Sequence, residues 1–261
     1  MAITSKGKSE KISSIEGSAE LALAYVIQGG HRLSANVGYY SDAPPFNNSF
    51  ISPRTRNTIV SGLKNQNTIS ADINYQLSTS WMNLRLTGFL TQIYDQTDVM
   101  SFYDDSQQSM TNFAMTGIAQ RHMGIELGVK VPLPVDGLSV AGVLSFGEYI
   151  YTKNFKGKNP YMVQTVDNSA EVIRKEEIPY WVSHPSFRTV VMDGETMYDV
   201  DNDGNPYVKG QNKHYVPSTP QLAAEIALNY RTKSYWFFEL NGQYFDRAYL
   251  DMNPLYRTDM A

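Results

Sequence analysis

The sequence contains no cysteine among its 261 residues, which excludes disulfide bonds, zinc–thiolate sites and thiol catalysis. It also has no run of about 18 apolar residues, which excludes a transmembrane helix. Charged residues make up only 18% of the chain, a small share for an ordinary soluble surface. The net charge is −4, and this lack of a basic excess argues against nucleic acid as a partner.

What the sequence does contain is a regular alternation of apolar and polar side chains. Residues 67–78 place Ile69, Ile73 and Tyr75 at one parity, with Asp72 and Asn74 at the other. Because successive strand side chains point to opposite faces, this pattern indicates β-strands with one apolar face. The whole chain gives about eight such strands, which predicts an all-β, antiparallel, up-and-down sheet. They form four hairpins, over residues 18–40, 67–90, 120–152 and 219–247.

Two regularities extend over all the predicted strands. Connections alternate between short ones (Gly29-Gly30, 78–82, 132–137 and Thr232-Lys233) and long ones (42–66, 96–119 and 153–219). Strand charges share the polar parity, with Glu148 as an exception beyond the roughly ten residues that a spanning strand needs. The charges on that parity are Glu20, Arg32, Asp72, Arg85, Glu126, Lys130, Glu225 and Glu239. Short turns at one rim and long loops at the other are typical of an outer-membrane β-barrel.

Aromatic residues on the apolar parity cluster at two levels. Tyr25, Tyr75, Tyr230 and Trp236 lie near the short turns, whereas Tyr39 and Tyr244 lie at the far strand ends. Two belts of amphipathic rings fit the two interfaces of a membrane. A soluble β-sandwich would explain the alternation equally well. It explains the one-sided long loops and the aromatic levels less well, so we favour a barrel in which lipid covers the apolar face.

Several stretches resemble the C-terminal barrel region of TonB-dependent outer-membrane receptors, in the variety with a carboxypeptidase-regulatory-like N-terminal extension. They are "FISPRTRNTIVSGLKNQNTISADINYQL", "LTGFLTQIYDQTDVMSFYDD", "GIELGVKVPLPVDGLSVAGVLSFGEYIYT" and "VPSTPQLAAEIALNYRTKSYWFFELNGQYFDRAYLDMNPLYRT". The likeness covers most of residues 20–258. Its specificity comes from the order and spacing of these stretches, since each is a loose pattern by itself.

The resemblance implies a segment of an active nutrient importer located in the cell outer membrane. Such receptors close about 22 strands around an N-terminal plug. The implied partners are outer-membrane lipid, the missing plug and remaining strands, and the TonB complex acting through the absent N-terminal region. We expect an internal fragment, with a polar segment at 1–17 and a partial barrel at 18–258. The imported ligand is left open.

No catalytic, cofactor-binding or metal-binding set emerges, so we expect neither an enzyme nor a cofactor. Asp199, Asp201 and Asp203 match the start of a calcium loop, but Gly210 stands where a bidentate Glu is needed, which favours a solvated turn. The four histidines, His31, His122, His184 and His214, show no ligand spacing. Arg54 and Arg56 are candidates for an anionic ligand or lipopolysaccharide, although surface charge is the commoner role.

Two other functional classes stay open at this point. One is a soluble secreted β-sheet module that binds a ligand or glycan on its long loops. The other is a small-barrel outer-membrane enzyme, which requires a Ser-His or His-carboxylate set at the rim. No histidine has a convincing partner in the sequence.

Overall fold

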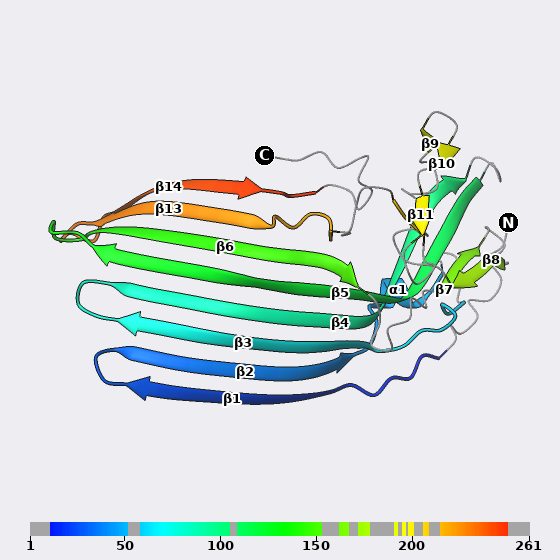
Figure 1. The fold of residues 1–261 in the computed structure, drawn as a ribbon, viewed down its shortest axis with the longest axis horizontal. Coiled ribbons are helices and arrows are strands. Elements are labelled where there is room, and N and C mark those ends of the chain that lie inside the picture. The colour runs from blue at the N-terminus through cyan, green and yellow to red at the C-terminus, as the bar shows by residue number, and fades with distance from the viewer. Residues whose placement is uncertain are drawn as a thin grey trace, which may run out of the picture.

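A computed structural model gives the arrangement of the chain (Figure 1). It describes residues 11–51, 58–104, 109–152, 162–166, 172–177, 191–192, 195–196, 198–200, 206–208 and 215–249. The central feature is one antiparallel sheet whose neighbouring strands follow the order β1-β2-β3-β4-β5-β6-β13-β14. These strands are β1 (Gly17–Ile27), β2 (His31–Asp42), β3 (Gln66–Ser78), β4 (Asn83–Asp104), β5 (Ser109–Pro132), β6 (Leu138–Thr152), β13 (Leu222–Arg231) and β14 (Phe237–Asp246). The predicted all-β, antiparallel, up-and-down architecture with eight main strands is confirmed.

The strand register keeps the apolar parity on one face across the whole sheet. Tyr25 of β1 lies opposite Leu33, Leu33 lies opposite Tyr75, and Tyr75 lies opposite Leu86. Further along, Leu228 of β13 lies opposite Leu240 of β14. Because a slip of one residue would turn a whole strand over, this register fixes a single apolar face.

The short turns all lie at one end of the sheet, seen on the left in Figure 1. The four connections are residues 28–30, 79–82, 133–137 and 232–236. Gly29 and Gly30 both have positive φ, at 85° and 84°, which suits the tight first hairpin. The predicted short connections are therefore confirmed at one end of the sheet, although the fourth spans 232–236 and is longer than the expected Thr232-Lys233. Each long connection emerges at the opposite end.

The segment expected as a long loop at 96–119 forms a hairpin for most of its length. β4 and β5 remain paired as far as Asp104 opposite Ser109. Their register shifts near Ile93–Thr97, where Asp95 and Gly117 adopt positive φ of 56° and 78°. Such bulges bend a strand pair and increase its twist, and both strands turn sharply there (Figure 1). The local alternation is lost at this bend, which is why the sequence pattern indicated a loop.

The connection at 153–219 contains short strand pairs in its described parts. β7 (Met162–Val166) pairs with both β5 and β8 (Val172–Glu177), which extends the protruding end of the β4–β5 hairpin. β9 (Val191–Met192) pairs with β10 (Glu195–Thr196), and β11 (Tyr198–Val200) pairs with β12 (Pro206–Val208). The division of the chain at residues 17 and 258 stays a prediction, because residues 1–10 and 250–261 lie outside the described residues.

Most of the buried apolar residues lie at the long-loop end of the sheet. There Ile51, Val60 and Ala114 form a small cluster, with Leu63 and Val99 packed against it. The short helix α1 (Phe46–Ser49) starts the segment that carries Ile51. The side-chain amide of Asn48 donates to the carbonyl of Thr97 at 2.8 Å, which ties this segment to β4. Within the described residues, no helix combines the length and apolar character needed to cross a membrane.

Candidate functional site

The apolar face of the sheet is open over the described part of the chain. Ile73 in the third strand is 55% exposed, and Leu240 in the last strand is 72% exposed. A two-layer sandwich would seal such positions within an inter-sheet core. Figure 1 shows the eight strands as a single layer. Within the described part of the chain, no second sheet lies over these positions.

Aromatic side chains lie on the apolar face at two levels, as predicted from parity. At one edge of the sheet, Tyr25 pairs with Leu33 of β2, and Tyr39 lies six positions further along β2. Tyr230 lies six positions after Ala224, the residue opposite Tyr244. Six positions correspond to about 20 Å along a strand. The two aromatic levels therefore have the same spacing at both edges of the sheet.

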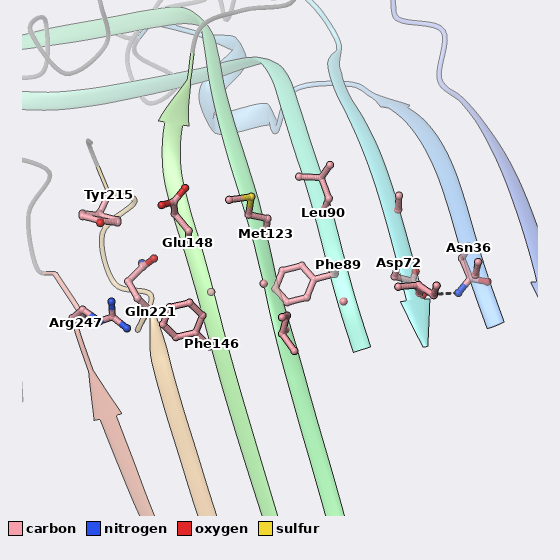
Figure 2. Close-up of a pocket in the computed structure, with 17 residues that line it drawn as sticks. Asn36, Asp72, Phe89, Leu90, Met123, Phe146, Glu148, Tyr215, Gln221 and Arg247 are labelled. Atoms are coloured by element: carbon pink, nitrogen blue, oxygen red, sulfur yellow. Dashed lines mark hydrogen bonds between the residues drawn. The ribbon is translucent and has the colours of Figure 1, made fainter. Parts of the chain in front are cut away.

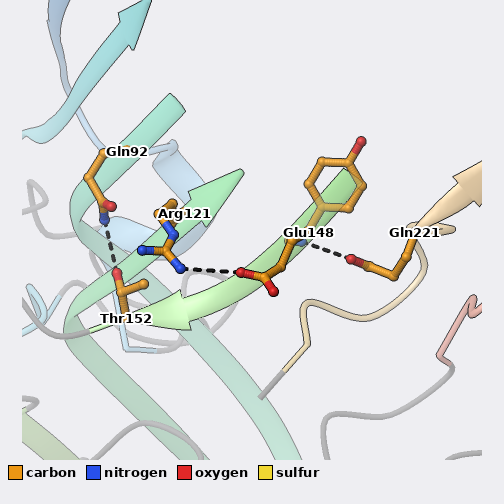
Figure 3. A network of polar contacts seen from close by, with 6 residues as sticks. Gln92, Arg121, Glu148, Thr152 and Gln221 are labelled. Carbon is orange, nitrogen blue, oxygen red and sulfur yellow. Dashed lines mark hydrogen bonds and ion pairs between the residues drawn. The ribbon is translucent and has the colours of Figure 1, made fainter. Parts of the chain in front are cut away.

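The apolar band ends at a polar cluster near the long loops (Figure 3). A nitrogen of the Arg121 guanidinium lies 3.2 Å from a carboxylate oxygen of Glu148. In the same cluster, the side-chain amide of Gln92 donates to the hydroxyl of Thr152 at 2.9 Å. Arg121, Glu148 and Gln92 all have the apolar parity, because Met123 lies opposite Glu148 and Leu90 opposite Met123. The apolar part of β5 therefore covers positions 123–131, which is about 27 Å along the strand. For a strand tilted as in membrane barrels, this length corresponds to an apolar band about 20 Å high.

The opposite face carries a buried hydrogen-bond network in its middle. The Asn74 side chain is 7% exposed, and its amide oxygen accepts from the hydroxyl of Thr87 at 2.7 Å. Its amide nitrogen donates to Asp72, and Asp72 also accepts from Asn36 at 2.7 Å. Arg85 reaches the same Asn74 oxygen at 3.4 Å. A polar face that buries such side chains while the apolar face stays exposed reverses the arrangement of an ordinary soluble sheet.

Replacing Asn74 with Leu is expected to destabilise the folded sheet by about 1–3 kcal/mol, because the buried Thr87 hydroxyl loses its acceptor. Urea unfolding followed by tryptophan fluorescence measures this change. The matched control is Asn241→Leu on the exposed last strand, whose amide makes only a 3.4 Å contact with Glu239. Equal free energies of unfolding for the two variants would contradict a structural role of the Asn74 network.

A hollow of about 790 Å³ crosses the middle strands (Figure 2). It opens where the apolar face carries Gly88, because a Cβ at that position would contact only the Cγ2 of Ile73, at 3.6 Å. On the polar face the equivalent space is filled, since a Cβ at Gly124 would lie 2.9 Å from the ring of Phe89. The apolar-face residues that line the hollow include Ile73, Leu90, Met123, Ile125 and Phe146. Asn36, Asp72 and Phe89, which have the polar parity, also belong to the lining.

At one end of the hollow, side chains from the chain's C-terminal part meet the sheet. The Arg247 guanidinium lies over the Phe146 ring, with 5.1 Å between its Cζ and the ring centroid. The Gln221 side-chain oxygen accepts from the backbone N–H of Tyr149 at 2.9 Å. These residues lie close together in Figure 2. Neither Arg121 nor Arg247 is a candidate from the sequence pattern, although Arg121 shares the apolar parity of Met123.

The structure separates the other residues that the sequence analysis considered. His31 contacts the Tyr75 hydroxyl at 2.7 Å, whereas His122 contacts Gln120 at 3.0 Å. Glu126 and Glu225 lie on β5 and β13, with β6 between them. Within the described ranges, no three His, Asp or Glu residues gather closely enough to hold a metal ion.

Asp201, Asp203, His184, His214, Arg54 and Arg56 lie outside the described residues, and only the backbone of Asp199 is described, in β11. The calcium loop therefore stays a hypothesis that the sequence itself disfavours.

Comparisons with known proteins show a distant likeness among solved structures. No family model matches the chain, and no curated protein matches it. Among solved structures, a "Copper transporter OprC" is similar with a TM-score of 0.48 and 14% identity. The match covers 84% of this chain and 25% of that chain, so the present chain spans about a quarter of the length of that transporter.

Proposed function

We propose that the chain forms part of the wall of an outer-membrane β-barrel receptor of the TonB-dependent type, with its apolar face on lipid. The observation that carries the proposal is the open apolar face, on which Ile73, Ile125 and Leu240 are each more than half exposed. Monomeric soluble proteins rarely expose contiguous apolar patches larger than a few hundred Å². Hydrocarbon removes the cost of exposing this face, because lipid tails are as apolar as the side chains.

The edges of the sheet support membership of a larger barrel. In the described sheet, β1 and β14 each pair with one neighbour only. Their outer backbone N–H and C=O groups therefore need partners, which a bilayer does not supply. Additional strands on both sides would satisfy these groups, as in a barrel of about 22 strands. The TonB-dependent type is proposed from the likeness of the quoted sequence stretches, and with it a plug, the TonB complex and an imported ligand as partners.

In this assignment the polar face lines the barrel interior and the long connections lie outside the cell. The chain then contributes wall and loop surface to nutrient uptake and performs no chemistry itself. Asp72, Arg85, Glu126 and Glu225 become interior charges, which membrane barrels accommodate in contact with water. No observation supports the alternative of a soluble binding module, because such a module would need a second layer over the apolar face.

The proposal is tested by placing probes on the two faces of the sheet. Since the chain has no cysteine, Ile226→Cys and Val143→Cys each give a single labelling site. Ile226 is 64% exposed on the apolar face, and Val143 is 52% exposed on the polar face. After reconstitution of the full chain into phosphatidylcholine vesicles, a fluorophore at position 226 should be quenched strongly by brominated acyl chains. The same fluorophore at position 143 should be quenched by aqueous iodide instead.

The soluble alternative gives a different result in the same experiment. A soluble module would remain in the supernatant after vesicle flotation, with both probes quenched by iodide. That outcome would reject the membrane assignment. Membership of a TonB-dependent receptor is tested separately, by sequencing the neighbouring coding region, which should encode a plug and further strands.

A further inference from the structure

Arg247 presents a positive charge beside the apolar face. Its side chain is 39% exposed, and its guanidinium lies over the ring of Phe146, a residue of the apolar face. No described residue accepts a hydrogen bond from this guanidinium, and its Nε atom is buried without a hydrogen-bond partner. Among the described residues, Arg247 forms one ion pair, a 3.9 Å contact between its Nε and the Asp246 carboxylate. The cation therefore retains most of its hydrogen-bonding capacity.

The hollow provides an apolar trough that leads to this cation. Its walls at that end are Phe146, Ile125 and Met123, and Gly88 leaves a notch further along the same face. Arg247 and Phe146 lie together at the end of the hollow (Figure 2). An elongated apolar group in the trough would thus end beside a guanidinium, whose planar donors match the oxygens of a phosphate.

Two carboxylates lie near the Arg247 end of the hollow and reduce its positive charge. Asp246 is the neighbour of Arg247, and Glu148 of the hollow lining is held by Arg121 at 3.2 Å. The Arg121 Nε is also buried without a hydrogen-bond partner. Removing the charge of Glu148 would free the Arg121 guanidinium, which lies 3.2 Å from this carboxylate of the hollow lining. The site therefore has one available cation and a second one that is held back by Glu148.

We propose that this hollow binds an anionic lipid, with an acyl chain in the trough and a phosphate headgroup on Arg247. The inference rests on the proposed function, since the apolar face must be in a bilayer for a lipid to reach the hollow. The position of the hollow supports the proposal. Phe146 lies two residues before Glu148 on β6, next to the polar cluster of Arg121 and Glu148 that ends the apolar band. Arginine at the membrane interface keeps its charge at the headgroup level while its stem contacts apolar surface.

The test is a lipid titration of the full chain in detergent, read by native mass spectrometry. Phosphatidylglycerol should be retained over phosphatidylcholine with the same acyl chains. Arg247→Gln should weaken phosphatidylglycerol binding about tenfold, the loss expected for one charge-assisted hydrogen bond. The matched control is Arg32→Gln, which removes an exposed arginine from the polar face and should leave the affinity unchanged.

A second variant is expected to act in the opposite direction. Glu148→Gln should strengthen phosphatidylglycerol binding several-fold, because it removes a negative charge from the hollow and releases the Arg121 guanidinium. A purely structural role of Glu148 would instead leave the ratio of the two lipid affinities unchanged.

Three results would overturn the lipid site. They are equal retention of the two lipids by the unmodified chain, equal losses in Arg247→Gln and Arg32→Gln, and full competition by soluble glycerol phosphate. The last would indicate a site for a free phosphate ester that makes no use of the trough. The position 226 probe distinguishes these results from failure of the proposed function, since that probe would still report lipid contact if only the lipid site were wrong.

Discussion

Gly137→Ala is expected to destabilise the sheet by more than about 2 kcal/mol. Gly137 has a φ of 80°, a conformation that L side chains rarely adopt. An added Cβ would also lie 1.9 Å from the carbonyl oxygen of Arg231, so the two backbones would have to separate. That movement would break the 2.8 Å hydrogen bond from the Arg231 N–H to the Gly137 carbonyl, which closes the end of the β6–β13 ladder. Urea unfolding of the reconstituted chain measures the loss.

The same geometry recurs at another short turn, which makes the prediction more general. Gly30 has a φ of 84°, and a Cβ there would lie 2.0 Å from the carbonyl oxygen of Ser78. The Ser78 N–H donates to the Gly30 carbonyl at 2.9 Å. Gly30→Ala should therefore cost as much as Gly137→Ala. Each glycine lets one hairpin turn approach the neighbouring hairpin closely.

The control for both variants is Gly128→Ala in β5. A Cβ at Gly128 would meet no atom within 4 Å, and its φ lies outside the positive range. Alanine there should be neutral, or stabilising by up to about 1 kcal/mol, because it restricts the unfolded chain. If Gly128→Ala and Gly137→Ala had equal free energies of unfolding, the close approach at the turn would not be a constraint.

The faces of the sheet could be predicted from the sequence, whereas contacts between distant segments could not. Alternation has a period of two residues, so the parity of Ile73 or Leu228 follows from its immediate neighbours. The close approach of Gly137 to Arg231 involves residues far apart in sequence, and no local pattern signals it. The contact of Arg247 with Phe146 has the same character. This contact and the hollow beside it arise only when the chain is folded.

The segment at 96–119 shows where pattern reasoning fails within the sheet. Asp95 and Gly117 each adopt a positive φ at a register shift. The residues that face the apolar side therefore change parity between one side of the shift and the other. The sequence therefore indicated a loop where the ladder in fact continues. Arg121 lies at the start of the predicted hairpin at 120–152, and its role depends on a partner in another strand. The register that brings it near Glu148 becomes visible only after β5 and β6 are paired.

Ile125→Arg is expected to destabilise the chain in a bilayer by about 1–2 kcal/mol, the cost of a cation on a lipid-facing strand between the bilayer midplane and the interface. Ile125 is 57% exposed and lies between Gly88 and Phe146 on the apolar face. On a water-exposed surface the same substitution would change stability by less than about 0.5 kcal/mol. The measurement is urea unfolding in vesicles, and the size of the effect reports which solvent the side chain meets.

Val143→Arg is the control that isolates the solvent from the substitution. Val143 is 52% exposed, close to the value for Ile125, but it lies on the polar face opposite Glu225. An arginine there gains a carboxylate neighbour and contact with water, so its effect should stay within about 0.5 kcal/mol. Two residues of equal exposure on opposite faces would then differ several-fold in cost. Equal costs at positions 125 and 143 would mean that both faces meet the same solvent, which a barrel wall does not allow.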